Sequence, residues 1–144
     1  MNTCSFRASL KDAMSASVPL KVILVEDHLT YRQALAFLLS EDPGLEVLAQ
    51  VGSLAQAREA LAGGLDGAAV DVALLDLQLP DGDGRELIGE LRRSSPGIRI
   101  VVLSATVGAE ETEEVRRSGA DAVLEKVRSY STIAEEVRRI GGGR

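Results

Sequence analysis

Aromatic residues are scarce in this sequence, and the core they leave must be aliphatic. The 144 residues include two Phe, two Tyr and no Trp, although 45% are hydrophobic. A chain of this length can bury a sizeable core without disulfides or metal, and here that core must consist of Leu, Val, Ile and Ala. Such a core is typical of parallel strands covered by helices.

Cysteine and long apolar runs are also lacking. The single cysteine, Cys4, excludes an internal disulfide and fits a reducing compartment. No stretch approaches the roughly 20 apolar residues that cross a membrane, and the first twenty residues lack the apolar segment of a secretory signal. These absences predict a cytoplasmic protein with no membrane partner.

Positive charge is in deficit. The sequence has 16 basic and 22 acidic residues, a formal net charge of −6. Because binding to a nucleic-acid backbone needs clustered cations, we expect no direct nucleic-acid binding by this segment. The acidity itself is explained by solubility.

What is present is a regular alternation of apolar and amphipathic segments over residues 20–140, which predicts one domain. Residues 1–19 are interpreted as an N-terminal extension. A short amphipathic helix carrying Phe6, Leu10 and Met14 and a disordered leader are both open for this extension.

Five strand patterns alternate with five helix patterns inside that domain. The predicted strands are 21–25, 46–51, 70–76, 98–103 and 122–124. The predicted helices are 30–40, 53–63 with Ser53 as N-cap, 85–94, 108–118 and 131–140, and 79–84 is a turn-rich loop. Five β-then-α units predict the α/β class, with a doubly wound five-stranded parallel sheet.

Polar side chains follow four of these strands where each strand ends. Glu26 and Asp27 follow the first strand, Asp76 ends the third, Ser104 follows the fourth and Lys126 comes near the end of the fifth. Open parallel sheets bind their ligands outside the carboxyl ends of the strands. We therefore expect three carboxylates, a hydroxyl and an ammonium group to converge at one edge of the sheet.

Three carboxylates in one place repel one another, and a divalent cation relieves that repulsion. Oxygen ligands of this kind favour Mg²⁺, or a similar ion such as Mn²⁺. With the cation held by Glu26 and Asp27, Asp76 is left as a nucleophile able to form an acyl phosphate. Lys126 and Ser104 are suited to bind two of the phosphoryl oxygens, so the set predicts phosphoryl transfer.

Each of these residues alone has a simpler interpretation. Glu26 and Asp27 could cap a helix, Asp76 could begin a loop, Ser104 could be structural and Lys126 could be a solvated surface charge. Only a shared site explains why they recur at successive strand ends. The choice of lysine supports it, because the chain has three Lys against 13 Arg and only Lys126 falls at the carboxyl end of a strand.

The sequence resembles the response-regulator receiver family over about residues 20–140. The segments that carry the resemblance are Val-Ile-Leu-Val-Glu-Asp at 22–27, Ala-Leu-Leu-Asp-Leu-Gln-Leu-Pro-Asp-Gly-Asp-Gly at 73–84, Val-Val-Leu-Ser-Ala at 101–105 and Gly-Ala-Asp-Ala-Val-Leu-Glu-Lys at 119–126. The resemblance implies the strand order 2-1-3-4-5. It also implies a histidine kinase as phosphodonor.

The resemblance implies, for the residues at the strand ends, the roles that their chemistry already suggested. It implies an acidic pair at Glu26 and Asp27, a phosphoacceptor at Asp76 and a switch hydroxyl and lysine at Ser104 and Lys126. It further implies that the backbone carbonyl of Gln78 is a metal ligand and that the side chains of Gln78 and Thr106 tune dephosphorylation. On this interpretation the chain is a phosphoacceptor signalling domain, not an enzyme, that assists its own phosphorylation and dephosphorylation.

The start Glu26-Asp27-His28 followed by Arg32 looks most like regulators that carry a LuxR-type helix-turn-helix output domain, which would control transcription. Residues 141–144 then read as the start of a linker or a C-terminal tail, and an excised receiver is favoured over a single-domain regulator. In the family, the fourth and fifth helices form dimers, which makes Arg116 and Arg117 candidate dimer residues.

Two departures from the family pattern stand out. Val123 replaces the aromatic residue that often lies three positions before the lysine, and Val127 replaces the Pro that often follows it, so no cis bond is expected there. His28, the only histidine, is expected in the first helical turn near the mouth of the site, in preference to a metal-ligand role.

Three other classes of protein remain as alternatives. A haloacid-dehalogenase phosphatase would need a second Asp at position 78, where the chain has Gln78. A flavin carrier would need a Ser/Thr/Gly-rich loop after Val25. A pseudo-receiver, a phosphorylation-independent protein-interaction module, is disfavoured by the intact acidic residues but left open by Val123.

Overall fold

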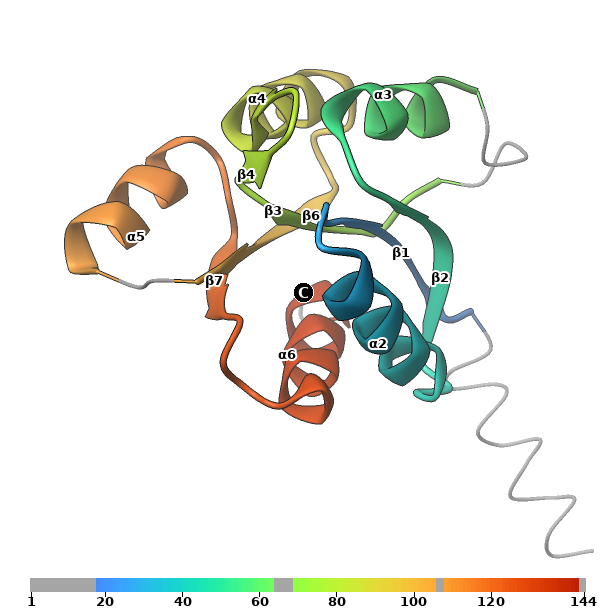
Figure 1. The fold of residues 1–144 in the computed structure, drawn as a ribbon. Coiled ribbons are helices and arrows are strands. Elements are labelled where there is room, and N and C mark those ends of the chain that lie inside the picture. The colour runs from blue at the N-terminus through green and yellow to red at the C-terminus, as the bar shows by residue number, and fades with distance from the viewer. Residues whose placement is uncertain (1–17, 64–68, 106–107, 143–144) are drawn as a thin grey trace, which may run out of the picture.

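Five short aliphatic strands form a parallel sheet at the centre of the fold (Figure 1). The computed structural model describes residues 18–63, 69–105 and 108–142, so both interpretations of the N-terminal extension, and Thr106, lie outside the described residues. The strands are β1 (Leu20–Val25), β2 (Leu45–Val51), β3 (Val72–Asp76), β6 (Arg99–Ser104) and β7 (Ala122–Glu125). Their order is β2-β1-β3-β6-β7, which confirms the predicted order 2-1-3-4-5.

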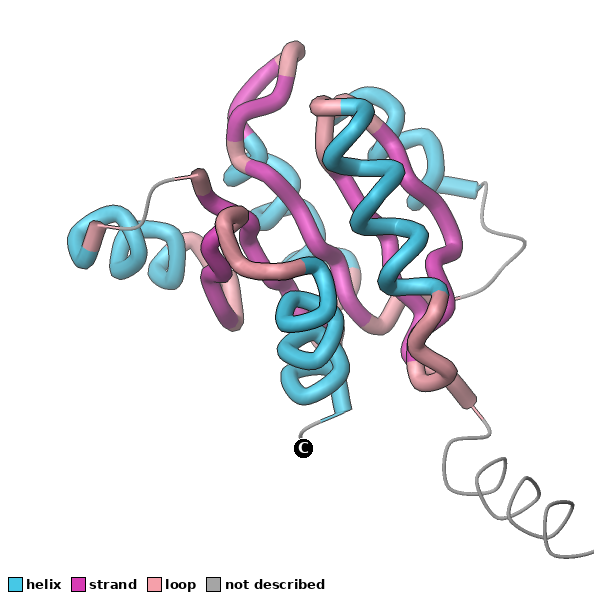
Figure 2. Tube along the Cα trace, turned by 60° about the horizontal axis from the view of Figure 1, so that its bottom comes forward, coloured by secondary structure: helices cyan, strands magenta, loops and turns pink. Residues whose placement is uncertain are grey.

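Helices cover both faces of the sheet, as Figures 1 and 2 show. One face carries α2 (Leu29–Ser40) and α6 (Tyr130–Gly142). The other carries α3 (Leu54–Gly63), α4 (Gly84–Ser94) and α5 (Ala109–Arg117). The predicted doubly wound α/β architecture is therefore confirmed.

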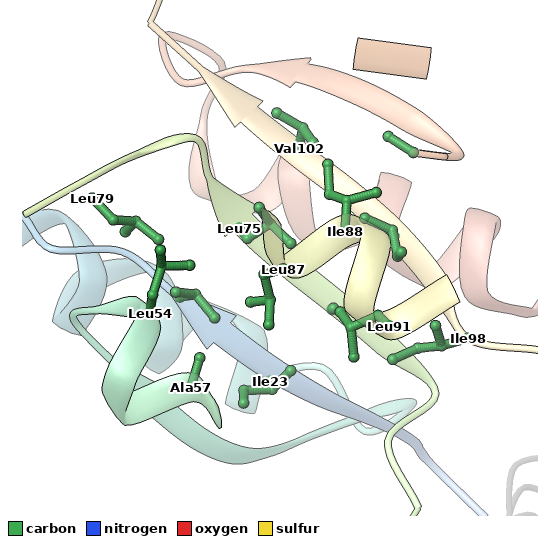
Figure 3. Close-up of a cluster of buried hydrophobic side chains, with 14 of the residues drawn as sticks. Ile23, Leu54, Ala57, Leu75, Leu79, Leu87, Ile88, Leu91, Ile98 and Val102 are labelled. Atoms are coloured by element: carbon green, nitrogen blue, oxygen red, sulfur yellow. The ribbon is translucent and has the colours of Figure 1, made fainter. Parts of the chain in front are cut away.

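Alternating side chains of each strand feed two separate cores. In β3, Val72 and Leu74 pack with α2 and α6, whereas Ala73 and Leu75 pack with α3 and α4 (Figure 3). All four are fully buried, which explains why the strand reads as an unbroken apolar run. Burial of each large side chain stabilises the fold by about 1.5–3 kcal/mol.

The structure differs from the sequence prediction in the loop after β3 and, by one or two residues, at the ends of several elements; β3, for example, begins at Val72 and not at residue 70. The predicted loop after β3 contains a small antiparallel hairpin, β4 (Gln78–Leu79) paired with β5 (Gly82–Asp83). The last helix continues to Gly142, two residues beyond its predicted end. Gly141 explains this extension, because it is buried so closely that an added Cβ would lie 2.7 Å from a methyl carbon of Val72.

Asp81 connects the loop after β3 to the N-terminus of α3. Its two carboxylate oxygens accept the backbone N–H groups of Leu54 and Ala55, at 2.8 and 2.9 Å. These backbone donors, led by Ala55, hold the pKa of Asp81 below its ordinary value. The predicted N-cap Ser53 also accepts an N–H, from Gln56 at 3.1 Å, so α3 begins at a doubly capped end.

No helix in the described part of the chain is long and apolar enough to cross a membrane.

Candidate functional site

Three carboxylates meet at the carboxyl end of the sheet. Glu26 and Asp27 follow β1, Asp76 ends β3, and each offers an oxygen within 4.8 Å of the others. Glu26 is fully buried and Asp76 is 8% exposed, while Asp27 faces solvent. Adjacent parallel strands end at the same edge, which is why residues 50 positions apart lie together.

Lys126 joins two of these carboxylates. Its Nζ lies 2.6 Å from Glu26 Oε1 and donates a hydrogen bond to Asp76 Oδ2 at 2.8 Å. Burial alone lowers the pKa of Lys126, but the interactions with Asp76 and Glu26 outweigh burial and raise it above 10.5. The lysine is therefore held charged between the two acids.

On the side of α2 and α6, Tyr31 contacts the lysine and Tyr130 contacts Tyr31. Lys126 Nζ lies 5.2 Å from the centre of the Tyr31 ring, a cation–π distance. The Tyr31 and Tyr130 rings are 5.5 Å apart and tilted by 60°. Burial raises the pKa of Tyr31 to about 12, an effect that Lys126 opposes and Glu26 reinforces.

Ser104 reaches the same edge from the opposite face of the sheet. Successive strand residues alternate between faces, and in β6 Val102 packs towards α3 and α4, so Ser104 has the same orientation. Its Oγ donates to Glu111 Oε1 of α5 at 3.2 Å. Leu124 packs towards α2 and α6, and Lys126, two residues later, lies on that same side of the sheet.

A pocket of about 440 Å³ opens over the Asp76 carboxylate. Its lining includes Asp76, Ser104, Lys126, Glu111 and Arg85. The pocket is large enough for a phosphoryl group and polar enough to bind one.

The turn below Asp76 is tightly packed. Gln78 donates its backbone N–H to Asp76 Oδ1 at 3.1 Å; the metal-ligand role of its carbonyl stays a prediction. A Cβ on Gly84 would lie 2.6 Å from the Asp76 carbonyl oxygen and 2.9 Å from Leu77 Cα. Only glycine fits at this position, so Asp76 rests on a rigid floor.

The acidic cluster fits a divalent metal ion. Its ligands are carboxylate oxygens, the donor type that Mg²⁺ and Mn²⁺ prefer. Glu26 Oε1 is buried and makes no directed hydrogen bond within the described residues, although it forms the ion pair with Lys126. A buried carboxylate oxygen with an unused lone pair is suited to hold a cation.

Sequence reasoning missed Arg85 and Glu111, which line the pocket from helices, and Tyr31, which contacts the lysine. None of the three follows a strand, so strand ends could not reveal them. His28 is the N-cap of α2 and accepts the Tyr31 N–H at 3.2 Å, as expected for the first turn. The described residues contain no cis peptide bond.

The match to known families agrees with this geometry. The model of the response regulator receiver domain matches residues 22–138. The chain belongs to the response regulator receiver domain family.

Two of the curated relatives are transcriptional regulators of greater length. The chain is 36% identical over 124 residues to the DNA-binding transcriptional activator DevR/DosR of Mycobacterium tuberculosis, covering 86% of this chain and 55% of that protein. It is 36% identical over 122 residues to the transcriptional regulatory protein UhpA of Salmonella typhimurium, covering 85% and 59%. The chain thus spans little more than half the length of these relatives.

Solved structures show the same fold. The signal receiver domain of the response regulator NarL from Mycobacterium tuberculosis superposes with a TM-score of 0.77 at 25% identity, covering 88% of this chain and 98% of that one. A CheY-like receiver domain from Methanospirillum hungatei gives a TM-score of 0.72 at 18% identity, covering 87% and 95%. The latter likeness concerns the fold alone.

Proposed function

We propose that Asp76 accepts a phosphoryl group in a reaction that needs Mg²⁺ or Mn²⁺. The observation that supports this most is the 4.8 Å cluster of Glu26, Asp27 and Asp76 with Lys126 bridging its two buried members. The cluster stands beside a polar pocket at the ligand-binding edge of the sheet. It provides a nucleophile, a cation site and a fixed positive charge in one place.

In the proposed mechanism, an Asp76 carboxylate oxygen attacks phosphorus in line. The new O–P bond forms as the bond from phosphorus to the donor nitrogen breaks, and the donor imidazole leaves. Glu26, Asp27, the Asp76 carboxylate and the Gln78 carbonyl would hold the metal, which supplies charge neutralisation when bound. Lys126 exchanges part of its contact with Asp76 for a phosphoryl oxygen.

Ser104 completes the proposed switch. Its hydroxyl leaves Glu111 and donates to a phosphoryl oxygen, which shifts a pre-existing equilibrium of the adjoining loop and helix. The domain is thus proposed as a phosphoprotein that assists its own phosphorylation and dephosphorylation without being an enzyme.

The partners we propose are a histidine kinase as donor and a DNA-binding output module of the LuxR type, in line with the names of the relatives. Residues 20–140 form the receiver unit in this proposal, 1–19 an extension and 141–144 the start of a linker or tail. We further propose a cytoplasmic location, and a homodimer through α5 and α6 that involves Arg116 and Arg117, both exposed on α5.

Intact mass measurement tests the proposed reaction. Incubation with Mg²⁺ and acetyl phosphate should add one phosphoryl group, and Asp76→Asn should add none. Glu46→Gln is a matched control, because this exposed acid lies at the opposite end of the sheet and pairs with Lys21 at 4.0 Å. An unmodified wild-type protein would support the pseudo-receiver alternative, and multiple turnover of phosphate esters would support a phosphatase.

A further inference from the structure

Arg85 brings a second cation to the acceptor pocket. It follows the N-cap of α4, lines the pocket with Asp76 and Lys126, and pairs through Nη1 with Glu114 of α5 at 2.5 Å. Its Nε is buried and has no hydrogen-bond partner among the described residues, although it lies at ion-pair distance, 3.8 Å, from Asp83 Oδ1. One edge of the guanidinium is therefore engaged and another still has a donor to offer.

The bond between Arg85 and Glu114 is easily exchanged. The two side chains are 36% and 59% exposed, and solvent-exposed ion pairs contribute little to stability. A phosphoryl group carries more charge than a carboxylate and matches the planar fork of arginine with two parallel hydrogen bonds. Beside Asp76 it would compete strongly for the same guanidinium.

We propose that Arg85 binds the phosphoryl oxyanion on Asp76 and gives up Glu114 to do so. This inference rests on the proposed phosphorylation of Asp76 and adds a phosphoryl-binding residue to that site. Glu114 is then the competitor that keeps Arg85 turned towards α5 in the unphosphorylated protein.

The exchange has a direct consequence for α5. Glu111 and Glu114 are three residues apart and share one face of the helix; they hold Ser104 and Arg85 respectively. A phosphoryl group recruits both partners at once. Phosphorylation thereby removes both of these contacts and leaves two acidic side chains facing new negative charge.

Opposite responses of two variants distinguish this role from a structural bridge. Beryllofluoride, formed from Be²⁺ and fluoride with Mg²⁺ present, serves as the phosphoryl probe, and ¹⁹F NMR measures its affinity. Arg85→Gln should weaken binding about tenfold, the size of a lost charge-assisted hydrogen bond. Glu114→Gln should strengthen binding about threefold, because it frees Arg85 from an exposed pair.

Controls separate this exchange from general charge effects. Glu113→Gln removes an exposed negative charge from the same helix, and Arg58→Gln breaks a comparable ion pair, between α3 and α4 at 2.6 Å. Both should change the affinity less than twofold. In the Arg85→Gln background, Glu114→Gln should lose its effect, since Glu114 acts only through Arg85. Arg85→Lys keeps the charge but not the fork, and is expected between wild type and Arg85→Gln.

Two results would overturn the inference. If Arg85→Gln and Glu114→Gln weaken binding alike, Arg85 only bridges α4 and α5. If Glu114→Gln strengthens binding equally with and without Arg85, the effect is general repulsion. A wild-type protein that binds no beryllofluoride would overturn the proposed function as well, so the two failures are distinguishable.

Discussion

The two sides of the acceptor pocket are built very differently. On the lysine side, Glu26, Asp76 and Lys126 project from strand ends; the two acids are buried, and the lysine side chain is 19% exposed. On the α5 side, Ser104 and Arg85 contact Glu111 and Glu114, two exposed side chains on one helix. The sheet fixes the first side, whereas a single surface helix holds the second.

This difference separates chemistry from response. Breaking a buried ion pair leaves an uncompensated charge and is costly, so the lysine side keeps its geometry for the proposed attack on phosphorus. Exposed pairs are worth little, so the α5 side can change partners when a phosphoryl group arrives. Variants on the lysine side should therefore abolish the reaction, and variants on the α5 side should tune it.

The largest effect is expected for Lys126→Gln. Loss of a preorganised charge next to the transferring group should slow phosphorylation by acetyl phosphate about 100-fold. Without Mg²⁺, the unfolding free energy should fall by about 3 kcal/mol, because two buried carboxylates lose their cation; added Mg²⁺ should restore part of it. Mass spectrometry and urea unfolding check the two effects. Lys126→Arg keeps the charge, so its phosphorylation rate and unfolding free energy should both fall less. A wild-type phosphorylation rate in Lys126→Gln would contradict the account.

Gly84→Ala tests the rigid floor below Asp76. A methyl group there meets backbone atoms at 2.6 and 2.9 Å, and overpacking of this kind costs about 1–3 kcal/mol of unfolding free energy. The acceptor should shift, and phosphorylation should slow. Gly97→Ala is the matched control, since a Cβ there has no atom within 4 Å. Equal urea midpoints for the two variants would refute the packing argument.

Glu111→Gln tests the α5 side. Its effect on unfolding free energy should stay within about 0.5 kcal/mol, as for other surface substitutions. Phosphorylation should become about twofold faster, because Ser104 is held less firmly away from the acceptor. The exposed neighbour Glu110 gives the control, Glu110→Gln, which should leave the rate unchanged. A slower rate in Glu111→Gln would mean that this carboxylate assists the reaction.

The smallest effect concerns Tyr31, at the back of the lysine side. Burial raises its pKa from the ordinary tyrosine value to about 12, so its neutral form is favoured in the folded state. That contribution to stability is complete below pH 10 and is lost as the pH rises towards 12. Absorbance titration should show an ionisation near pH 12 that Tyr31→Phe removes and Tyr130→Phe keeps. A step near pH 12 that survives in Tyr31→Phe would contradict this assignment.

The fold was predictable because each strand carries its own signal. An unbroken run such as Val22–Val25 is explained only by burial on both faces of a sheet. Because a helix follows each strand, the sheet had to be parallel. The hairpin β4–β5 was not predictable, since two-residue strands have no periodicity to read. The last two residues of α6 were missed because Gly normally ends a helix, and the close packing of Gly141 is visible only in three dimensions.

The site divides in the same way. Strand-end residues such as Asp76 and Lys126 are brought together by topology alone, so their proximity could be predicted from the sequence. Glu111 and Arg85 sit on helices whose rotation against the sheet depends on packing, and an acidic helix such as α5 reads simply as a solvated face. Their contacts could not be found from spacing.

Chemical location of the phosphoryl group tests the central claim most directly. Borohydride reduces an aspartyl phosphate to homoserine, which peptide mass mapping assigns to one residue. After treatment with acetyl phosphate and Mg²⁺, we expect homoserine at position 76 and nowhere else, and none when the metal is chelated. Homoserine at another aspartate, or equal labelling without a divalent ion, would contradict the proposed acceptor and its metal site.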